Sequence, residues 1–245
     1  MTLFIIGLGL NDEKDITLKG LAAVKKCKKV YLENYTSKLN CPLTKLEKLY
    51  KKKIILADRS LIESQAEKTI LKEAKSSNIA LLVVGDPFGA TTHIDLILRA
   101  KEMGIKTQTI HNTSILTAVG IIGLELYKYG KTTSIPFHNE NVTTPVKVLK
   151  SNLANGLHTL FLLDLDPKEN KFMPVNEAIG YLLRNRVHED ILAIACAQLG
   201  SENPVIKAGR LKELKEFKFK KFPQCLVIPA KLHFIEEEAL GCYKI

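Results

Sequence analysis

The 245-residue chain has no tryptophan, and aromatic residues make up only 7% of it. Proteins that bind single-stranded RNA stack its bases on aromatic side chains, so this scarcity argues against a plain RNA-binding protein. The five cysteines stand far apart and include no C-x-x-C pair, which argues against a disulfide framework or a zinc site and favours a reducing cytoplasm. No apolar run approaches the roughly 20 residues of a membrane span, so we expect no membrane association.

Recognisable catalytic groups are also missing. The six histidines show no metal-ligand spacing, and no nucleophile elbow accompanies them. We therefore predict neither a catalytic side chain nor a metal ligand. His93, in the first turn of an expected helix, is interpreted as a structural hydrogen-bonding residue rather than a base. The apolar N-terminus MTLFIIGLGL lacks the basic region and cleavage site of a signal peptide and is typical of a first strand.

Positive charge is in excess: 36 Lys and Arg residues stand against 26 Asp and Glu residues, a net charge of +10. The excess is concentrated in the segments 25–29, 51–53 and 212–221. Such a surface attracts nucleic acid or a partner that works near it. Lysines at helix ends and on an edge strand also serve only to keep a protein soluble and its edges unpaired. Both interpretations stay open, and we predict no direct requirement for nucleic acid.

The first part of the chain alternates short apolar strands with helical stretches. Segments typical of a parallel sheet buried on both faces are 2–9, 29–34, 53–57, 79–85 and 106–110. Helical spacing is found at 15–27, 60–76 and 91–103. Asp15 and Ser60 stand at N-cap positions, and Gly104 follows the third helix. This order predicts an α/β domain with right-handed crossovers.

Beyond about residue 112 the strands lie closer together, which predicts a second domain with a mixed sheet. Helices are expected at 114–130, 145–155, 174–183 and 233–240, and strands at 157–165, 191–198, 205–209 and 224–230. No internal repeat or low-complexity linker separates the two parts. We therefore expect two closely packed domains, 1–112 and 113–245.

The run LVVGDPFGATTH breaks a buried strand with an unusually shaped turn. Gly85 leaves room at the carboxyl edge of the sheet, where open α/β sheets bind ligands. Gly89 allows close approach of the backbone to a ligand, and Thr91 or Thr92 can cap the next helix. A tight turn in which Asp86 bonds its own backbone is the alternative. Similar loops, GLGLND and HNTSI, follow two strands expected to be neighbours, so the three together predict a lined cleft.

GLGLND also suggests a dinucleotide-binding turn. Gly7 and Gly9 would form the turn, and Glu33 would bind a ribose hydroxyl. The third glycine of that fingerprint is replaced by Asp12, however, and Asp15 follows. Two carboxylates beside a helix N-terminus repel a pyrophosphate, which disfavours this hypothesis.

Several motifs follow one another in the order of a known family. They are GLGLNDEKDIT (7–17), VYLENYTS (30–37), VVGDPFGATTH (83–93), HNTSI…AVG…GLELYKYGKTTSI (111–135), GLHTLFLLDL (156–165) and PAKLH (229–233). Together they resemble the diphthine synthases, methyltransferases of the tetrapyrrole-methylase fold family. G-D-P alone marks the wider family, whereas GLGL…DIT…YTS with GDPFGATTH is specific to this branch. The resemblance covers nearly the whole chain.

The resemblance implies a two-domain α/β fold of the tetrapyrrole-methylase type, with the active site in the cleft between the domains. It implies S-adenosyl-L-methionine (SAM) as methyl donor, S-adenosyl-L-homocysteine as product, and a homodimer in the cytoplasm. The implied substrate is translation elongation factor 2, on a histidine that carries a 3-amino-3-carboxypropyl group. Methylation of that amino group is a step toward diphthamide. We expect the trimethylammonium product, although eukaryotic members also form a methyl ester. A tetrapyrrole or other small-molecule methylase of the same fold is the alternative.

By the same resemblance, the SAM contacts fall on Leu10, Asp86, Gly89, Ser114, Ile115, Leu163, Leu199 and Gln224. Two positions depart from the family pattern. Gln198 stands where the family commonly has arginine, and Gln224 where it commonly has histidine. Contacts made by the backbone would tolerate both changes. Asp86 is expected to position the cofactor rather than to act as a base, and Asp164 either touches a ligand or caps a turn.

Overall fold

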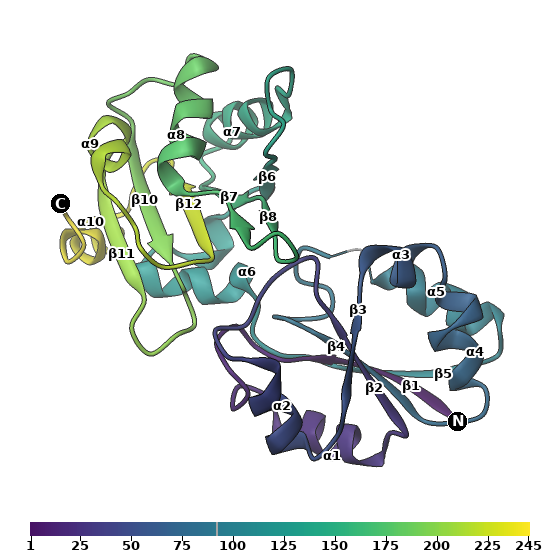
Figure 1. Ribbon diagram of the computed structural model, residues 1–245. Helices are drawn as coiled ribbons and strands as arrows, with labels where there is room; N and C mark the ends of the chain where they lie inside the picture. The colour runs from purple at the N-terminus through teal and green to yellow at the C-terminus, as the bar shows by residue number, and fades with distance from the viewer. Residues whose placement is uncertain (92) are drawn as a thin grey trace. The chain divides into compact units, whose positions relative to one another are not determined.

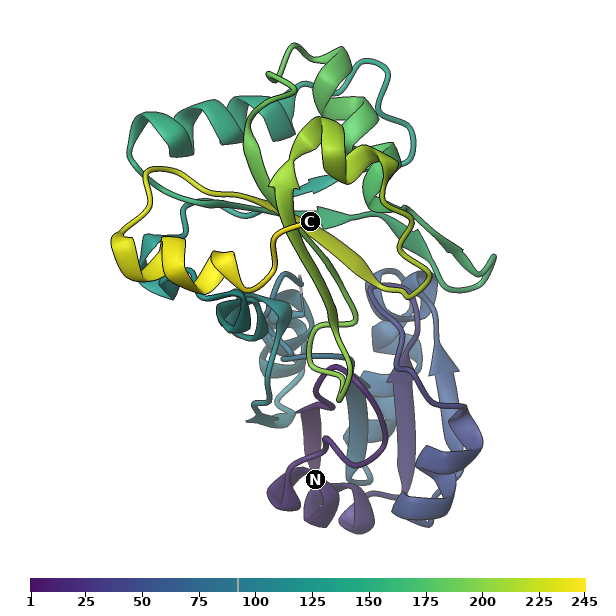
Figure 2. The same ribbon diagram turned by 90° about the vertical axis from the view of Figure 1, so that its left-hand side faces the viewer.

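The computed structural model describes residues 1–91 and 93–245 (Figures 1 and 2). Packing divides the chain into two compact units, Met1–Leu116 and Thr117–Ile245, which we call unit 1 and unit 2. The expected domain boundary, between residues 112 and 113, lies four residues before this division and stays an expectation. Among the described residues, no helix is long and apolar enough to cross a membrane.

Unit 1 is built on the five-stranded parallel sheet that the apolar runs predict. Its strands are β1 (Thr2–Gly7), β2 (Lys29–Glu33), β3 (Ile54–Ala57), β4 (Ile79–Val83) and β5 (Lys106–Ile110). They lie in the order β3-β2-β4-β1-β5, and every pairing is parallel. Because parallel strands end at the same edge, the loops after the neighbouring strands β4, β1 and β5 lie together there.

Helices cover both faces of this sheet (Figure 1). Helices α1 (Leu18–Lys26) and α2 (Leu43–Tyr50) pack on one face, and α3 (Arg59–Glu63), α4 (Ile70–Ala74) and α5 (Ile94–Glu102) pack on the other. Successive strand residues point to opposite faces. Thus Ile6 and Leu82 belong to the core under α1 and α2, whereas Ile5 and Leu81 belong to the other core. Burial on both sides explains why the central strands β1 and β4 are almost entirely apolar, whereas the edge strand β5 (KTQTI) is largely polar.

Unit 2 contains the expected mixed sheet. Its strands are β6 (Thr133–Ile135), β7 (Thr159–Leu163), β10 (Leu192–Ala197), β11 (Val205–Arg210) and β12 (Gln224–Ile228), in the order β11-β10-β12-β7-β6. Only the β6–β7 pairing is parallel. A separate hairpin joins β8 (Leu165–Asp166) and β9 (Lys171–Phe172). The two-sheet α/β fold expected from the sequence is therefore confirmed.

The core of unit 2 lies between one face of this sheet and three helices. These are α7 (Thr144–Ala154), α8 (Val175–Arg184) and α9 (Leu211–Glu216). Phe161 and Leu226 of the sheet meet Leu149, Tyr181 and Leu214 of the helices in this core. A further helix, α10 (Phe234–Gly241), follows the last strand.

Some helix predictions are wrong. The expected helix at 60–76 is α3, a 3-10 turn η1 (Ala66–Lys68) and α4, because Thr69 has φ −122° and ψ −99°. The expected helix at 114–130 is α6 (Ile115–Ala118), η2 (Val119–Ile122) and η3 (Leu126–Lys128), interrupted at Gly123 with φ 92°. Helices α2 and α9 are not predicted by the sequence patterns at all.

The expected helix caps are partly wrong. Thr17, not Asp15, caps α1 by accepting a hydrogen bond from the backbone N–H of Gly20. Asp15 instead accepts the N–H of Asn11, at 2.7 Å. Asp58, not Ser60, caps α3. Beyond α5, Gly104 has φ 69°, which confirms the predicted left-handed glycine.

Candidate ligand-binding site

The loops after β1 and β4 are hydrogen-bonded to each other through glycines. The N–H of Gly85 donates to the carbonyl of Gly9 at 2.7 Å, and the N–H of Gly9 donates back to Gly85 at 3.3 Å. Both residues have positive φ, 76° for Gly9 and 82° for Gly85. A Cβ added at Gly7 would lie 2.6 Å from the Gly85 carbonyl oxygen. These glycines therefore allow two loops of the protein itself to meet.

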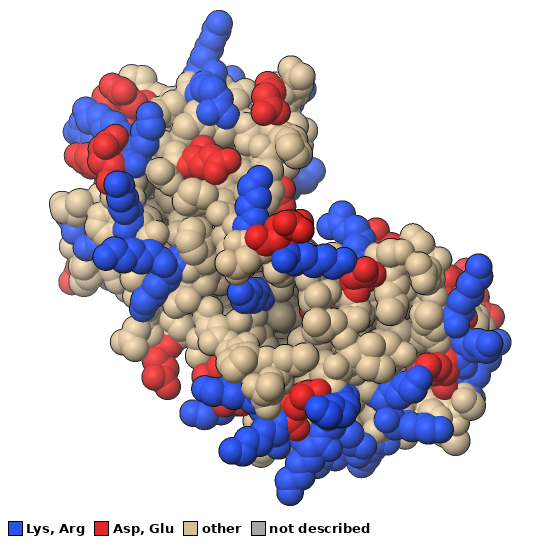
Figure 3. All heavy atoms as spheres, in the orientation of Figure 1, with Lys and Arg blue, Asp and Glu red and all other residues tan. Residues whose placement is uncertain are grey.

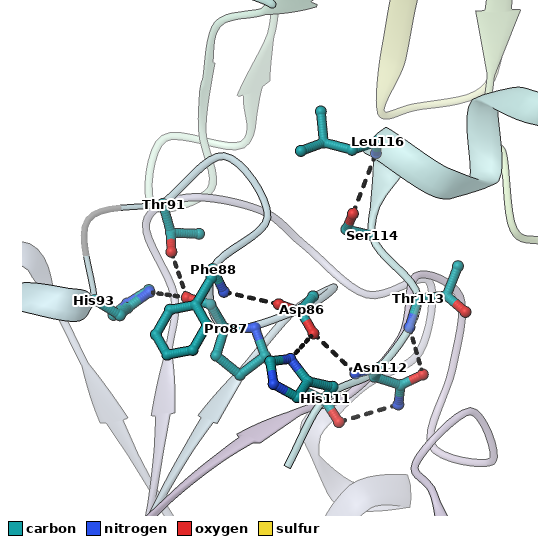
Figure 4. Close-up of polar contacts among 11 residues, drawn as sticks. Asp86, Pro87, Phe88, Thr91, His93, His111, Asn112, Thr113, Ser114 and Leu116 are labelled. Atoms are coloured by element: carbon teal, nitrogen blue, oxygen red, sulfur yellow. Dashed lines mark hydrogen bonds and ion pairs between the residues drawn. The ribbon is translucent and has the colours of Figure 1, made fainter. Parts of the chain in front are cut away.

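Asn112 joins the third loop to the other two. Its side-chain amide donates to the carbonyls of Gly7 at 3.0 Å and of Asp15 at 2.9 Å. Its backbone N–H donates to Oδ2 of Asp86 at 3.0 Å (Figure 4). The sequence patterns include Asn112 in HNTSI but do not single it out, because its partners lie about a hundred positions away in the chain.

Asp86 is the polar centre of the arrangement (Figure 4). Its Oδ1 accepts a hydrogen bond from the N–H of Phe88. Its Oδ2 accepts a hydrogen bond from the N–H of Asn112 and lies 2.9 Å from Nδ1 of His111. Burial alone raises the pKa of the Asp86 carboxyl, but these hydrogen bonds outweigh burial and hold the pKa below its ordinary value. The carboxylate is thus ionised and shapes the turn. His111, missed by the sequence patterns, is its mostly exposed partner.

Four of the five expected contact residues in unit 1 lie around this turn. A Cβ added at Gly89 would come within 2.5 Å of the Ser114 Cβ, so Gly89 and Ser114 are in direct contact. A Cβ added at Gly85 would be in ordinary van der Waals contact with Leu10, at 3.6 Å, and with Ser114, at 3.8 Å, so these two residues flank Gly85. Leu10, Asp86, Gly89 and Ser114 therefore lie together around this turn. The fifth residue, Ile115, begins α6 directly after Ser114.

The turn is also held from inside the unit. The hydroxyl of Thr91 donates to the carbonyl oxygen of Pro87, and Nδ1 of His93 lies 3.2 Å from the same oxygen. Thr91 is therefore not the cap of α5, whose N-cap position is His93 with no side-chain cap bond. Thr92, the other expected cap, lies outside the described residues. His93 thus makes the structural hydrogen bond that was expected of it.

The three expected contact residues of unit 2 come to one edge of its sheet. Leu163 ends β7, Gln224 begins the antiparallel neighbour β12, and Leu199 follows the end of β10 by two residues. Ala197 of β10 pairs directly with Gln224. Since β10, β12 and β7 are adjacent, these residues form a second cluster within unit 2.

Backbone partners occupy the polar side chains of the second cluster. Oε1 of Gln224 accepts the N–H of Val175 at 2.8 Å, and its Nε2 donates to the carbonyl of Lys221 at 2.8 Å. Gln198 donates to the carbonyl of Phe222 at 2.9 Å. Both side chains are therefore held by backbone groups of the protein itself. Asp164 accepts the N–H groups of residues 137 and 165, so the turn-capping interpretation is the one that the structure supports.

The electrostatics of the unit 1 site favour a cationic ligand. Asp12, Asp15 and Asp86 lie on its hydrogen-bonded loops. The carboxylate of Asp15 accepts hydrogen bonds from the backbone N–H groups of residues 11 and 12, which are therefore not free to bind a phosphate. This arrangement disfavours the dinucleotide hypothesis. In the part of the chain that the structure describes, no group of three or more His, Cys, Asp or Glu side chains could hold a metal ion.

Comparison with known proteins decides the family. Residues 2–215 match the family model described as Tetrapyrrole (Corrin/Porphyrin) Methylases. The chain belongs to this family. A diphthine synthase from Methanocaldococcus jannaschii is 46% identical over 250 residues, covering 97% of each chain. The diphthine methyl ester synthase of Dictyostelium discoideum is 43% identical over 272 residues, covering 100% of this chain and 99% of that one.

The solved structures place this tetrapyrrole methylase in the same branch. A crystal structure of a diphthine synthase superposes with a TM-score of 0.94 at 39% identity, covering 100% of this chain and 96% of the other. The resemblance read from the motifs is therefore confirmed over the whole length, and so are the tetrapyrrole-methylase fold and the class of enzyme, a methyltransferase.

Proposed function

We propose that this tetrapyrrole methylase is a SAM-dependent N-methyltransferase of diphthamide biosynthesis. It methylates the amino group of the 3-amino-3-carboxypropyl histidine of translation elongation factor 2. The observation that carries the proposal is the full-length similarity to proteins named diphthine synthase and diphthine methyl ester synthase. The clustering of the expected contact residues in each unit supports it.

The unit 1 site fits SAM in charge and in shape. SAM carries a positive sulfonium, and the Asp86 carboxylate in the turn is ionised. Gly85 has no side chain and is flanked by Leu10 and Ser114, so a ligand held at this turn would lie against its backbone. In this proposal Leu10, the 86–89 turn and the 114–115 segment hold the cofactor from unit 1.

Leu163, Leu199 and Gln224 complete the cofactor site from unit 2 in this proposal. Leu163 and Leu199 are buried apolar residues at one sheet edge, suited to packing against the adenosine part of the cofactor. The side chain of Gln224 is held by backbone groups, so its contribution is the backbone at the start of β12.

The absence of an expected catalytic side chain agrees with the chemistry. SAM supplies a methyl group already activated by its sulfonium, and the substrate amine in its neutral form is a sufficient nucleophile. The task of the protein is to hold amine, methyl carbon and sulfur in line, and orientation alone lowers such a barrier by several kcal/mol. Asp86 holds the turn in place and is not assigned as the base. The substrate carboxylate calls for a Lys or Arg partner.

The trimethylammonium form is the proposed product. The alignment with the Methanocaldococcus diphthine synthase extends over 250 residues, close to the length of this chain. The alignment with the Dictyostelium methyl ester synthase extends over 272 residues. This chain therefore lacks part of that longer protein. We further propose that the protein is a cytoplasmic homodimer. Light scattering of the purified protein would measure the mass of the dimer.

The deciding experiment incubates the protein with SAM and elongation factor 2 carrying the 3-amino-3-carboxypropyl histidine. Mass spectrometry of the modified peptide then counts the methyl groups. We expect three methyl groups, all stable to alkali; a fourth, alkali-labile group would identify a methyl ester. Elongation factor with an unmodified histidine is the control and should gain none. An unchanged peptide despite SAM binding would refute the substrate assignment and favour a small-molecule substrate.

A further inference from the structure

Two buried ionisable side chains of unit 1 have no part in the proposed cofactor contacts. Glu33, at the end of β2, is 1% exposed, and His93, just before α5, is 3% exposed. Charged or chargeable side chains are seldom buried so deeply without a specific partner. Both lie beside loops at the carboxyl edge of the sheet, and β2 pairs with β4, the strand that leads into the GDPFG turn.

His93 bonds the centre of that turn. Its Nδ1 lies 3.2 Å from the carbonyl oxygen of Pro87, which also accepts the hydroxyl of Thr91; Figure 4 shows both donors converging on this oxygen. A carbonyl can only accept, so Nδ1 carries the proton. Burial lowers the pKa of His93 by more than the nearby Glu33 carboxylate raises it. The ring is therefore neutral near pH 7. Pro87 thus has a fixed internal donor.

The other nitrogen of the ring faces Glu33. Nε2 of His93 has no hydrogen-bond partner among the described residues and lies 3.9 Å from Oε2 of Glu33. Glu33 itself accepts the N–H groups of Tyr35 and Thr36 and the hydroxyl of Thr36. The carboxylate is therefore committed to its own loop. The one strong directional contact of the imidazole is its bond to Pro87.

We propose that His93 is a positioning residue: its Nδ1–H fixes the Pro87 carbonyl and with it the conformation of the 85–89 turn, which sets cofactor affinity. This inference rests on the proposed function for the identity of the cofactor. It adds a residue that is not among the expected SAM contacts and that acts through the turn without touching the ligand. A preorganised turn binds more tightly because its ordering is complete before binding.

Two substitutions separate the hydrogen bond from the bulk of the ring. Asparagine places an amide nitrogen where Nδ1 of histidine stands, whereas glutamine places one where Nε2 stands. His93→Asn therefore keeps the donor to Pro87, and His93→Gln loses it. Asparagine is the smaller residue, so it leaves the larger cavity and should lower thermal stability at least as much as glutamine.

Across these variants, the affinity for SAM should depend on whether the hydrogen-bond donor to Pro87 is kept, and not on the thermal stability. We expect His93→Gln to raise the Kd for SAM about tenfold, which corresponds to about 1.4 kcal/mol, and His93→Asn to stay within about twofold of the wild type. Isothermal titration calorimetry gives the Kd values, and thermal unfolding gives the order of stability. A purely structural role would make affinity fall in the same order as stability, and that result would overturn the proposal.

Hydrogen exchange without cofactor separates this inference from the proposed function. Peptides covering residues 84–91 should exchange faster in His93→Gln than in the wild type and in His93→Asn. If they do so in a protein that binds no SAM, the positioning role stands and the cofactor assignment falls. Equal exchange and equal SAM affinity in all three proteins would overturn the positioning role and leave the methyltransferase assignment intact.

Discussion

At the scale of single residues, the contact between Gly89 and Ser114 is the tightest in the candidate site. An added Cβ at Gly89 would lie 2.5 Å from the Cβ and 2.8 Å from the Oγ of Ser114. Gly89→Ala must push the two loops apart, and overpacking of this kind costs about 1–3 kcal/mol. We expect a lower midpoint of urea unfolding and at least a tenfold weaker affinity for SAM, measured by fluorescence-monitored unfolding and by calorimetry.

Two further variants test whether the contact with Ser114 is the cause. Gly241→Ala introduces the same methyl group at the end of α10, where no atom lies within 4 Å, so its stability should equal or slightly exceed that of the wild type. The double variant Gly89→Ala with Ser114→Gly removes both clashing atoms and should regain stability relative to Gly89→Ala. If it did not, strain in the turn itself, not the clash, would explain the loss.

The sequence patterns identified the site where a residue's role is local. The positive φ of Gly85 and the turn at Asp86 could be expected from GDPFG itself, whereas the reason for glycine at 89 is its contact with Ser114 of another loop. The roles of Asn112 and His111 could not be expected, because their partners come from distant loops that only the sheet order brings together. The cap at Thr17 was missed for a different, local reason: the carboxylate of Asp15, the expected cap, accepts the amides of residues 11 and 12 in the loop before it.

At the scale of elements, helix α10 is anchored by one buried carboxylate. Glu236, with no exposed surface, accepts the N–H groups of His233 and Glu125, Nε2 of His158, and the ammonium group of Lys128. Burial alone raises the pKa of Glu236, but these donors lower it to about 2. This one side chain therefore joins α10 to η3 and to the residue that precedes β7.

Glu236→Gln removes the charge and leaves the ammonium of Lys128 without its buried partner, a change that costs about 3–5 kcal/mol in comparable ion pairs. Because the folded pKa of about 2 lies below the unfolded value of roughly 4.3, Glu236 contributes stability above about pH 5 and loses it as pH falls toward 2. The difference between variant and wild type should therefore be largest at neutral pH and shrink in acid.

Hydrogen exchange of the C-terminal peptide 231–245, measured between pH 7 and pH 3 with the intrinsic rates corrected, follows α10 directly. The control is Glu237→Gln on the same helix, where the side chain is exposed and should change exchange little at any pH. A constant difference between wild type and Glu236→Gln over the whole range would show that the charge of Glu236 is not what holds the helix.

Elements were predictable where burial decides them. The strands of unit 1 and β7, β10, β11 and β12 of unit 2 were located within a few residues, because their buried positions require apolar residues, whereas the short strands β6, β8 and β9 were not predicted. The break at Gly123 was not predictable. A Cβ there would lie 2.3 Å from the Cβ of Ala239, so the helix ends for the sake of a contact with α10, more than a hundred residues later. Helix α9 was hidden by the lysines of its exposed face.

At the scale of the whole molecule, the net charge of +10 becomes relevant through its distribution. Figure 3 shows Lys and Arg side chains gathered densely over the region of α1 and α2. Lys218 and Lys220 form a smaller exposed group in the segment before β12. This segment leads to Gln224, an expected cofactor contact, and its Lys221 carbonyl accepts the amide of that residue. From this short separation in sequence we infer that Lys218 and Lys220 would contact a protein substrate bound near Gln224.

We therefore expect Lys218→Glu with Lys220→Glu to raise the KM for elongation factor 2 several-fold at low salt while leaving the Kd for SAM unchanged. The matched control is Lys25→Glu with Lys26→Glu, which alters net charge equally at the end of α1. That end lies at the amino edge of the unit 1 sheet, away from the candidate site. Methyl transfer measured from 0.05 to 0.5 M salt should show the difference between the two pairs vanishing as the Debye length falls from above 10 Å toward about 4 Å. Equal effects of both pairs on the KM would mean that only the total charge steers the encounter. A larger effect of the α1 pair would indicate that the docking surface lies in the region of α1 and α2.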